Sequence, residues 1–590
     1  MIGTYAAVAA ICAASLAIGQ AALALCGARA WSWLSPAVGL ALVLAICWAT
    51  VRLPGDGVVP AVLVPALAVA AALFLRGRVG GGGEALRAGW PVALGALVAA
   101  SLPFLVEGHF GILGTGFNPD MSQHLLATDR LAEGQTSELS RQGYPLGPHA
   151  VVVALEKGLG IGFVQGFAGL TVAVAAIAPL TALAAFAELR PAPRTAAALV
   201  VGLVYLVASY FAQGAFKETL QALFLLAFVL ALREIGRSWS DLPLRFVPAA
   251  LLAAGAVYAY SFPALIWLAP TFLIWVGAVL AVNRPTAGRR LGPSPSQALL
   301  LALLVFAVLI GPELGRMLDF QRFETFDPDG PGLGNLFGQI SPLEALGIWP
   351  SGDFRLAPGD GAAPAALYYL GAGFGLALFA FGVVRLWTRR EAAILSGLAA
   401  AGLAYLAARL GGTAYTAAKA IEIASPLVAL GILMPLADQW RVCSRPVDKS
   451  ATAGWIYLAA AGFCSLLALA NAPVGPTSYS PELNRMRPLI ADGSTLVLAR
   501  DPLLAEEHGA EYLVWELRGG RVCVAPESEA GTAPPRGVRF VVTEGAVGDP
   551  PYPGFRVRRE APPYVLWEAT RPVAPTSPCP LIAVRQARQG

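Results

Sequence analysis

The chain has 590 residues, of which 56 % are hydrophobic and only 13 % are charged, and its mean hydropathy is +0.64. About a quarter of the residues of a soluble globular protein are charged, so this composition excludes an ordinary soluble protein. The net charge of +4 is small and gives no sign of a nucleic-acid-binding surface.

Apolar runs of about twenty residues recur along most of the chain, and each can cross a hydrocarbon core of about 30 Å as a helix. The sequence therefore predicts an α-helical polytopic membrane protein with about 14 transmembrane helices. The predicted spans are 4–27, 34–52, 59–76, 88–106, 161–188, 194–212, 216–233, 246–262, 264–282, 297–314, 364–386, 391–409, 414–437 and 452–471.

Basic residues mark every second connection between these spans. They are Arg76, Arg78, Arg87, Arg190, Arg194, Arg233, Arg237, Arg245, Arg284, Arg289, Arg290, Arg385, Arg389, Arg390, Arg441, Arg445 and Lys449. Short loops rich in Lys and Arg face the cytoplasm. We therefore expect both termini, and the long loops 107–160 and 315–363, to lie outside the plasma (inner) membrane of a bacterium.

The chain divides into three predicted parts: extra transmembrane helices over 1–87, a transmembrane catalytic module over 88–471, and a soluble extracytoplasmic α/β domain over 472–590. In the last part, "STLVLAR", "RVCVA", "VRFVV" and "YVLWEA" indicate short strands, and "PLLAEEHGAEYLVWEL" indicates a helix or a helix–strand pair. Cys523 and Cys579 lie in this part and could pair. No catalytic motif stands out in it.

The stretch "GFNPDMSQHLLATDR" (116–130) crowds polar residues into the first long outward loop. Loops longer than about fifteen residues usually have a function. We expect one short helix from about Pro119 to Leu131, with Asn118 as a possible N-cap, and a second, interfacial helix over 148–159. Asp120 is the candidate catalytic carboxylate. The alternative is that Asp120 only stabilises the helix dipole from the first turn.

Three of the four histidines lie in this loop. The candidate ligands of a divalent cation, such as Mg²⁺ or Mn²⁺, are Glu107, His109, Asp120 and His124. The alternative is that these interfacial histidines only form hydrogen bonds, because the loop has no HExxH-type spacing.

Lys217 and Lys419 stand out in a chain that otherwise uses arginine, and both lie near the outer ends of predicted spans. An ionisable group at membrane depth is costly and suggests a function. A lysine there can bind a phosphate as a point charge. The alternatives are snorkelling and an internal ion pair with a nearby glutamate, such as Glu218 or Glu422.

The second long outward loop, 315–363, adds charged and aromatic residues that suit a sugar or a phosphate, although an ordinary surface loop has them too. The full set of candidate substrate-binding residues is His124, Asp129, Arg130, His149, Lys217, Glu218, Arg316, Arg322, Arg355, Tyr415 and Lys419.

This arrangement resembles the GT-C-fold membrane glycosyltransferases, a class that includes protein mannosyltransferases and arabinofuranosyltransferases. The motif "NPDMSQH" would supply the essential loop carboxylate, Asp120; "YPLGPHA" would open the second juxtamembrane helix; and "YTAAKAIEIASP" resembles the late-helix lysine segment of bacterial members. Three spans precede the helix that leads into the acidic loop, whereas the family usually places that loop after its first helix. Asp129 or Glu107 could share the role of base.

The resemblance implies a glycosyltransferase that moves a hexosyl or pentosyl group, with inversion, from a polyprenyl-phosphate donor. The acceptor would be a glycan, lipid or protein of the cell envelope, and no nucleic acid would take part. Two other functions stay open from the residues alone: a transporter or flippase of lipid-linked glycans, and a non-catalytic envelope assembly protein. A transporter usually has inverted repeats with ionisable groups near the midplane, and no convincing repeat is present here.

Overall fold

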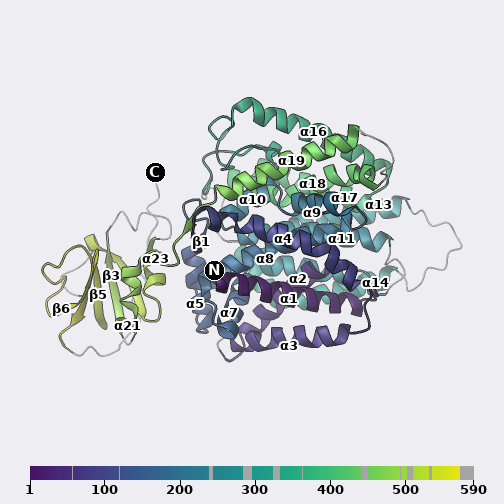
Figure 1. Ribbon diagram of the computed structural model, residues 1–590. Coiled ribbons are helices and arrows are strands. Elements are labelled where there is room, and N and C mark those ends of the chain that lie inside the picture. Colours follow the sequence, from purple (N-terminus) through teal and green to yellow (C-terminus); the bar gives the residue numbers. More distant parts are fainter. Residues whose placement is uncertain are drawn as a thin grey trace. The chain divides into compact units, whose positions relative to one another are not determined.

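A computed structural model describes residues 1–55, 57–118, 120–237, 243–282, 295–322, 332–361, 363–441, 449–491, 493–500, 509–529 and 534–571 (Figure 1). The chain forms two compact units. The helical unit comprises Met1–Phe117 and Leu131–Val474, and the C-terminal unit comprises Asn118–Arg130 and Gly475–Gly590. The domain boundaries predicted at 87/88 and 471/472 stay predictions.

The helical unit consists almost entirely of helices. Their bounds are α1 Ile2–Leu25, α2 Ser35–Val51, α3 Val58–Leu75, α4 Gly82–Val106, α6 Glu138–Arg141, α7 Gly147–Leu159, α8 Phe163–Phe186, α9 Pro191–Gly202, α10 Tyr205–Ala212, α11 Phe216–Arg237, α12 Val247–Tyr260, η1 Phe262–Ala264, α13 Leu265–Val282, α14 Pro295–Ile310, η2 Gly311–Glu313, α15 Leu314–Phe320, η4 Pro342–Leu346, α16 Ala365–Thr388, α17 Ala392–Gly411, α18 Ala414–Arg441 and α19 Lys449–Ala470. One short strand, β1 Ile112–Leu113, follows α4.

Within the described ranges, eleven helices are long and apolar enough to cross a membrane. A twelfth span results if α9 and α10 are counted as one, because the two are bent by 54° at their junction. The apolar helices α2 and α12 are shorter. The structure therefore confirms a polytopic helical membrane protein, whereas the exact count of 14 spans stays a prediction.

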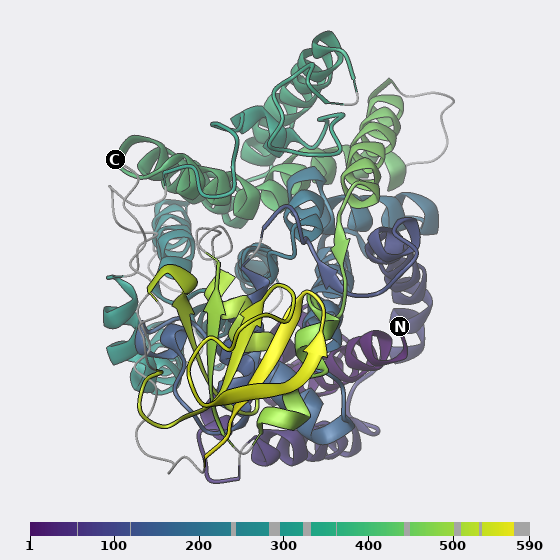
Figure 2. The ribbon, with the colours of Figure 1, turned by 90° about the vertical axis from the view of Figure 1, so that its left-hand side faces the viewer.

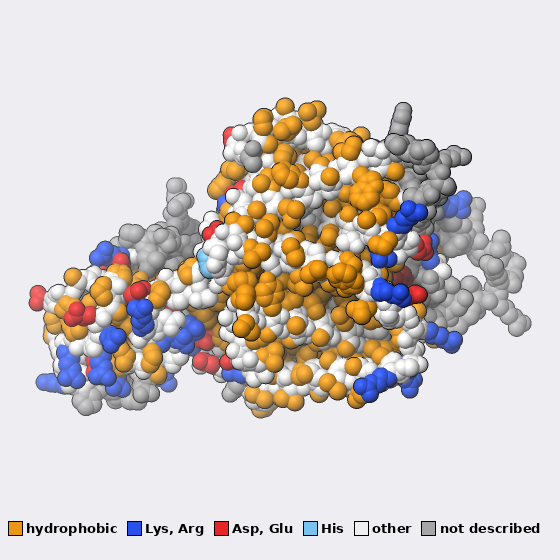
Figure 3. Space-filling model, in the orientation of Figure 1, with side chains coloured by type: hydrophobic (Ala, Val, Ile, Leu, Met, Phe, Trp, Pro, Cys, Tyr) orange, Lys and Arg blue, Asp and Glu red, His pale blue; other side chains and the backbone are white. Residues whose placement is uncertain are grey.

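Helices α8, α11 and α18 form the interior of the helical unit, and nearly all of their residues are buried. In contrast, α3, α14 and α16 turn large apolar side chains outward, such as Val62, Leu304 and Leu370. Figure 3 shows the resulting apolar surface over the middle of this unit. An apolar surface of this extent is stable in lipid and would be a liability in water.

Helices α1 and α2 approach each other so closely that only glycine fits at two positions. A Cβ atom on Gly19 would lie 1.9 Å from the Ser35 carbonyl oxygen, and one on Gly39 would lie 1.7 Å from the Ser15 carbonyl oxygen. Small residues of this kind let helix backbones pack tightly inside a membrane, where the hydrophobic effect does not drive association.

The connections of the bundle lie at two ends. At the end where α2 begins and α11 finishes, the Gly80 amide donates to the Arg29 carbonyl at 3.0 Å. At the same end, Arg233 pairs with Glu391 across 2.9 Å. Basic side chains gather at the right-hand end of the unit in Figure 3. The opposite end holds the loop residues after α4 and the starts of α11 and α18, and the candidate site lies there.

The C-terminal unit contains a mixed five-stranded sheet with the strand order β4-β3-β5-β7-β6 (Figure 2). Its elements are β2 Val474–Gly475 at its boundary, α5 Met121–Ala132, which begins within it, α20 Pro481–Asn484, α21 Arg487–Ile490, β3 Ser494–Ala499, α23 Gly509–Glu516, β4 Arg521–Pro526, η5 Glu527–Glu529, β5 Val538–Glu544, β6 Phe555–Ala561 and β7 Tyr564–Ala569. Strand β3 runs parallel to β4 and β5, and β7 runs antiparallel to β5 and β6.

The four strands predicted in this unit are all present, as β3, β4, β5 and β7. The sequence reading missed β6, "FRVRREA", because its middle positions are polar and exposed and so lack the apolar alternation of a strand. Cys523 is buried in β4, while its suggested partner Cys579 lies outside the described residues. The predicted loop residues Arg284, Arg289, Arg290 and Arg445 also lie outside them.

Candidate active site

A buried ion pair joins the first turn of α11 to the second turn of α18. The Lys419 ammonium lies 3.0 Å from a carboxylate oxygen of Glu218, and these side chains are 13 % and 4 % exposed. The same ammonium lies 4.1 Å from the centre of the Tyr415 ring, at a distance suited to a cation–π contact. A charge is tolerated at this depth because a partner of opposite sign compensates it.

Lys217 and Tyr144 extend this pair toward the loop between α6 and α7. The Lys217 ammonium lies 4.1 Å from the centre of the buried Tyr144 ring. The Tyr144 carbonyl accepts a hydrogen bond of 2.6 Å from the guanidinium of Arg316, in α15. Lys217 and Arg316 thus both contact Tyr144, and Lys217 directly precedes Glu218, the partner of Lys419.

Glu313 anchors a second cluster at this end. Its carboxylate accepts a hydrogen bond of 2.6 Å from the Trp48 indole and pairs with Arg52 at 3.2 Å and with Arg316 at 3.3 Å. Both guanidinium groups lie over the Trp48 ring, at 4.6 and 4.7 Å from its centre. The sequence reading missed Trp48, Arg52 and Glu313, because Trp48 and Glu313 are 265 residues apart along the chain.

The loop after α15 packs against the starts of α11 and α18. The Asn335 side-chain amide donates to Gln213 at 2.6 Å. A Cβ atom on Gly334 would lie 2.8 Å from the Tyr415 ring. This loop therefore contacts the residues that flank the Lys419–Glu218 pair.

Arg355 is fixed within the same loop. It forms a two-pronged ion pair with Asp353, with N–O distances of 2.8 to 3.2 Å. Its guanidinium lies between the rings of Phe117 and Phe337, at 4.4 and 4.3 Å from their centres. Asp353 neutralises the charge of Arg355. Arg355 can therefore hold the loop in place as well as contact a substrate. Arg322, in contrast, is exposed just after α15.

His149 is fully buried in α7, although the sequence indicated a substrate contact. Its imidazole meets the rings of Tyr144, Phe167 and Phe216 edge-on, at centre distances of 6.2, 5.3 and 5.8 Å. Burial lowers the pKa of His149 to about 3, so the ring is neutral at physiological pH. In this structure His149 joins three elements of the helical unit.

Asp120 immediately precedes α5, in the C-terminal unit. Its amide donates to the Asn118 side chain at 3.1 Å, and its carbonyl accepts from the amides of Gln123 and His124. The helix therefore begins two residues later than predicted, and Asp120 occupies the position where a carboxylate favours the helix dipole. His124 follows one turn later and is buried.

Asp129 pairs with Arg518 across 3.8 Å within the C-terminal unit. The Arg518 guanidinium stacks on Trp515 at 3.5 Å from the ring centre. Burial, with a smaller contribution from Arg487, lowers the pKa of Arg518 to about 10, against the opposing effect of Asp129. The pair connects α5 to the end of α23. Arg130, the next residue, is half-buried.

Among the described residues, no group of three or more His, Cys, Asp or Glu side chains is placed to hold a metal ion. Glu107 ends α4, and His109 lies near the Glu107 carbonyl at 3.0 Å. Asp120 and His124 belong to the other unit. The predicted divalent cation therefore stays a prediction.

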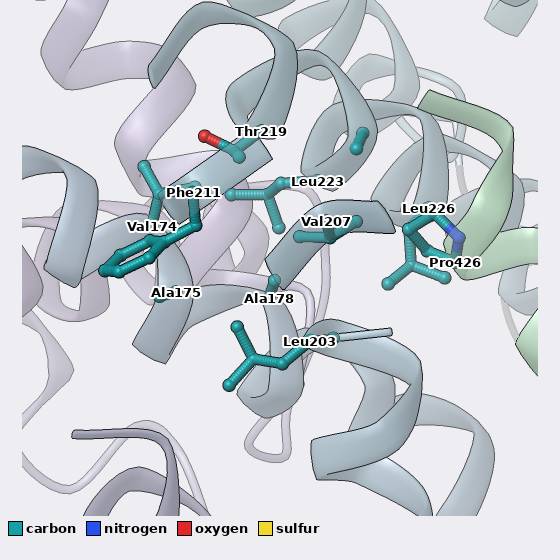
Figure 4. Close-up of a pocket in the computed structure, with 12 residues that line it drawn as sticks. Val174, Ala175, Ala178, Leu203, Val207, Phe211, Thr219, Leu223, Leu226 and Pro426 are labelled. Carbon is teal, nitrogen blue, oxygen red and sulfur yellow. The ribbon is translucent and has the colours of Figure 1, made fainter. Parts of the chain in front are cut away.

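A separate narrow pocket lies inside the helical unit, beside the bend between α9 and α10 (Figure 4). Apolar side chains such as Val174, Leu203 and Phe211 line it, and the hydroxyl of Thr219 is already bonded to backbone carbonyls. This pocket offers nothing to hold a sugar or a phosphate.

No protein-family model matches the sequence, and no curated protein matches it. Among solved structures, the chain is similar to the cryo-EM structure of arabinofuranosyltransferase AftD from mycobacteria, with a TM-score of 0.50 and 15 % sequence identity. The similarity covers 82 % of this chain and 40 % of that one, so this chain spans less than half of the transferase's length. The GT-C-like polytopic fold that the sequence motifs suggested is therefore confirmed.

Proposed function

We propose that the protein is a membrane glycosyltransferase that moves a sugar from a polyprenyl-phosphate donor to an envelope glycan, lipid or protein on the extracytoplasmic face. The observation that carries the proposal is the buried Lys419–Glu218 pair at the loop-rich end of a GT-C-like bundle. The neighbouring Lys217 and the more distant Arg316 both contact Tyr144 at this end. An ionisable group at membrane depth is by default a candidate for a functional site. A basic cluster suits a substrate that carries a phosphate.

The proposed reaction is a direct displacement with inversion at the anomeric carbon. An acceptor hydroxyl oxygen forms a bond to that carbon, the bond from the carbon to the phosphate oxygen breaks, and the Asp120 carboxylate takes the hydroxyl proton. The departing phosphate keeps the electron pair, and Lys217 and Lys419 stabilise its charge.

The orientation is part of this proposal. Basic loops such as those of Arg29 and Arg233 share one end of the bundle, and the rule for Lys and Arg assigns that end to the cytoplasm. The ionic clusters at the opposite end would then face the side on which lipid-linked sugars are used in envelope assembly.

The full chain, purified in detergent, should be given a panel of radiolabelled polyprenyl-phosphate sugars with candidate acceptors. The expected result is labelled product together with an equal amount of free polyprenyl phosphate. Adding a chelator tests the Mg²⁺ or Mn²⁺ prediction in the same assay. Movement of intact lipid-linked sugar across vesicles, with no bond broken, would instead identify a flippase and contradict the proposal.

A further inference from the structure

Three arginines converge on one carboxylate in the sheet of the C-terminal unit. Glu568, in β7, is almost buried, with its side chain 11 % exposed. Its oxygens lie 3.3 Å from Arg539, 3.8 Å from Arg556 and 3.7 Å from Arg558. We call Arg539, Arg556 and Arg558 the arginine cluster.

Two β-bulges aim members of this cluster at the same point. Between β3 and β5 the register passes from Val538 to Phe540 and leaves Arg539 as the extra residue. Between β6 and β7 it passes from Val557 to Arg559 and leaves Arg558 as the extra residue. A bulge redirects a side chain that regular alternation would send elsewhere. Arg556 needs no bulge, because it lies directly opposite Glu568.

The charges of this arrangement do not balance. Each guanidinium carries a full positive charge and five N–H donors, so three of them around one carboxylate leave a local charge of about +2. The three side chains remain 44 %, 66 % and 48 % exposed, in chain order. The register also places Arg559 opposite Leu566, on the face of the sheet that Glu568 shares.

We propose that the arginine cluster binds a phosphate group, carried either by a phospholipid headgroup or by a soluble phosphate ester such as a sugar phosphate. Glu568 holds the three guanidinium groups together, and their remaining donors are available to a tetrahedral anion. Arginine pairs with phosphate through two parallel hydrogen bonds, and several such pairs around one anion reinforce each other. A phosphate monoester, with a charge near −2, matches the local excess.

The site is independent of the proposed glycosyl transfer, since none of its residues belongs to the candidate active site. Ordinary solvated surface arginines would be spread along the strands. Here two separate β-bulges bring Arg539 and Arg558 to one buried carboxylate, which is the arrangement expected of a specific binding site.

The test uses the full-length protein in neutral detergent and a guanidinium-modifying reagent, p-hydroxyphenylglyoxal, with modification of each arginine read by mass spectrometry. Inorganic phosphate, glucose 1-phosphate and dihexanoylphosphatidylglycerol are titrated at constant ionic strength. Arg521 is the internal control, because it is exposed on β4 at the opposite edge of the same sheet. We expect at least one probe to protect Arg556 and Arg558 several-fold more than Arg521.

The variant Arg558→Gln should raise the half-protecting concentration at Arg556 by about tenfold, since one charged hydrogen-bonding partner is lost. Arg521→Gln should leave that concentration unchanged. A lower half-protecting concentration for the lipid or for the sugar phosphate identifies the carrier, and either result supports the site. Equal protection at Arg521 and Arg556, or an Arg556 response that Arg558→Gln does not alter, would overturn it.

Discussion

The Lys419 ammonium pairs with Glu218 at 3.0 Å, across two helices whose first turns are about 200 residues apart in sequence. The near neighbours along the chain are different: Glu218 follows Lys217, and Glu422 lies one turn after Lys419. The ion pair therefore joins residues on two different helices, rather than residues that are neighbours in the sequence. Glu422 is fully buried, and neither of its carboxylate oxygens has a hydrogen-bond partner among the described residues.

The first prediction concerns the stability that this pair provides. Glu218→Gln leaves the Lys419 charge uncompensated and should cost about 3–5 kcal/mol, seen as a lower apparent melting temperature of the purified protein in detergent. The double variant Glu218→Gln with Lys419→Met removes both charges and should recover most of that loss. Equal destabilisation in the single and double variants would contradict the pairing.

Activity separates this pair from an ordinary structural ion pair. Arg233 and Glu391 form a similarly buried pair at the other end of the bundle, so Glu391→Gln is a matched control. We expect Glu218→Gln with Lys419→Met to abolish sugar transfer even where it folds. Glu391→Gln should leave the transfer rate of the folded protein within about twofold of wild type.

The sequence predicted more of the local structure than of the site. Helices α5 and α7 begin within a few residues of the predicted positions, because their amphipathic pattern and start signals are local. Lys419 stood out because arginine is so dominant, but its partner could not be identified, since pairing across the bundle depends on how the helices pack. For the same reason, the sequence could not predict that Trp48 and Glu313 lie in one cluster.

Two site predictions look different in the structure for a physical reason. His149 was grouped with two other histidines because all three lie in one loop, yet its side chain on α7 is buried against aromatic rings. Asp129 was assigned to substrate, but it pairs with Arg518, in a segment that lies far away in sequence. Neither burial nor a distant partner can be read from a short motif.

The second prediction uses Trp48, whose buried indole donates to Glu313. Trp48→Phe removes that donor from a buried carboxylate and should cost about 1–3 kcal/mol beyond the lost packing. Trp267→Phe is the control, because the Trp267 indole is also buried but has no hydrogen-bond partner among the described residues. Thermal unfolding should show a larger loss for Trp48→Phe, and equal losses would argue against the hydrogen bond.

The third prediction concerns Glu344, in η4 of the loop between α15 and α16. Burial raises the pKa of its carboxyl well above the usual range, although a hydrogen bond from the Ser341 amide opposes the shift. A group with a raised folded pKa contributes stability at low pH that is lost as the pH rises above its unfolded pKa of about 4.3. Glu344→Gln should therefore raise the melting temperature at pH 8 more than at pH 5.

The exposed Glu84 provides the comparison for this effect. Glu84→Gln should change the melting temperature little, and by the same amount at both pH values. A Glu344→Gln protein that is destabilised at pH 8 would show that the carboxylate is needed in its charged form.

The fourth prediction is the opposite pH dependence at His149. Its folded pKa of about 3 lies below the unfolded value of about 6.5. The unfolded state therefore binds the extra proton between these values, and stability falls as the pH is lowered through this window, by about 1.4 kcal/mol per pH unit. His149→Gln should flatten the decline in melting temperature between pH 6.5 and pH 4. An unchanged slope would show that other groups cause the acid sensitivity.

The most direct test of the account is the rate of glycosylated product formation from a polyprenyl-phosphate sugar, measured for purified wild-type protein beside Asp120→Asn and Asp129→Asn. We predict transfer by the wild type, a loss of at least about a hundredfold in Asp120→Asn, and a much smaller loss in Asp129→Asn when all three proteins melt at similar temperatures. A folded Asp120→Asn protein that transfers sugar at the wild-type rate, or a wild-type protein that transfers none from any donor, would contradict it.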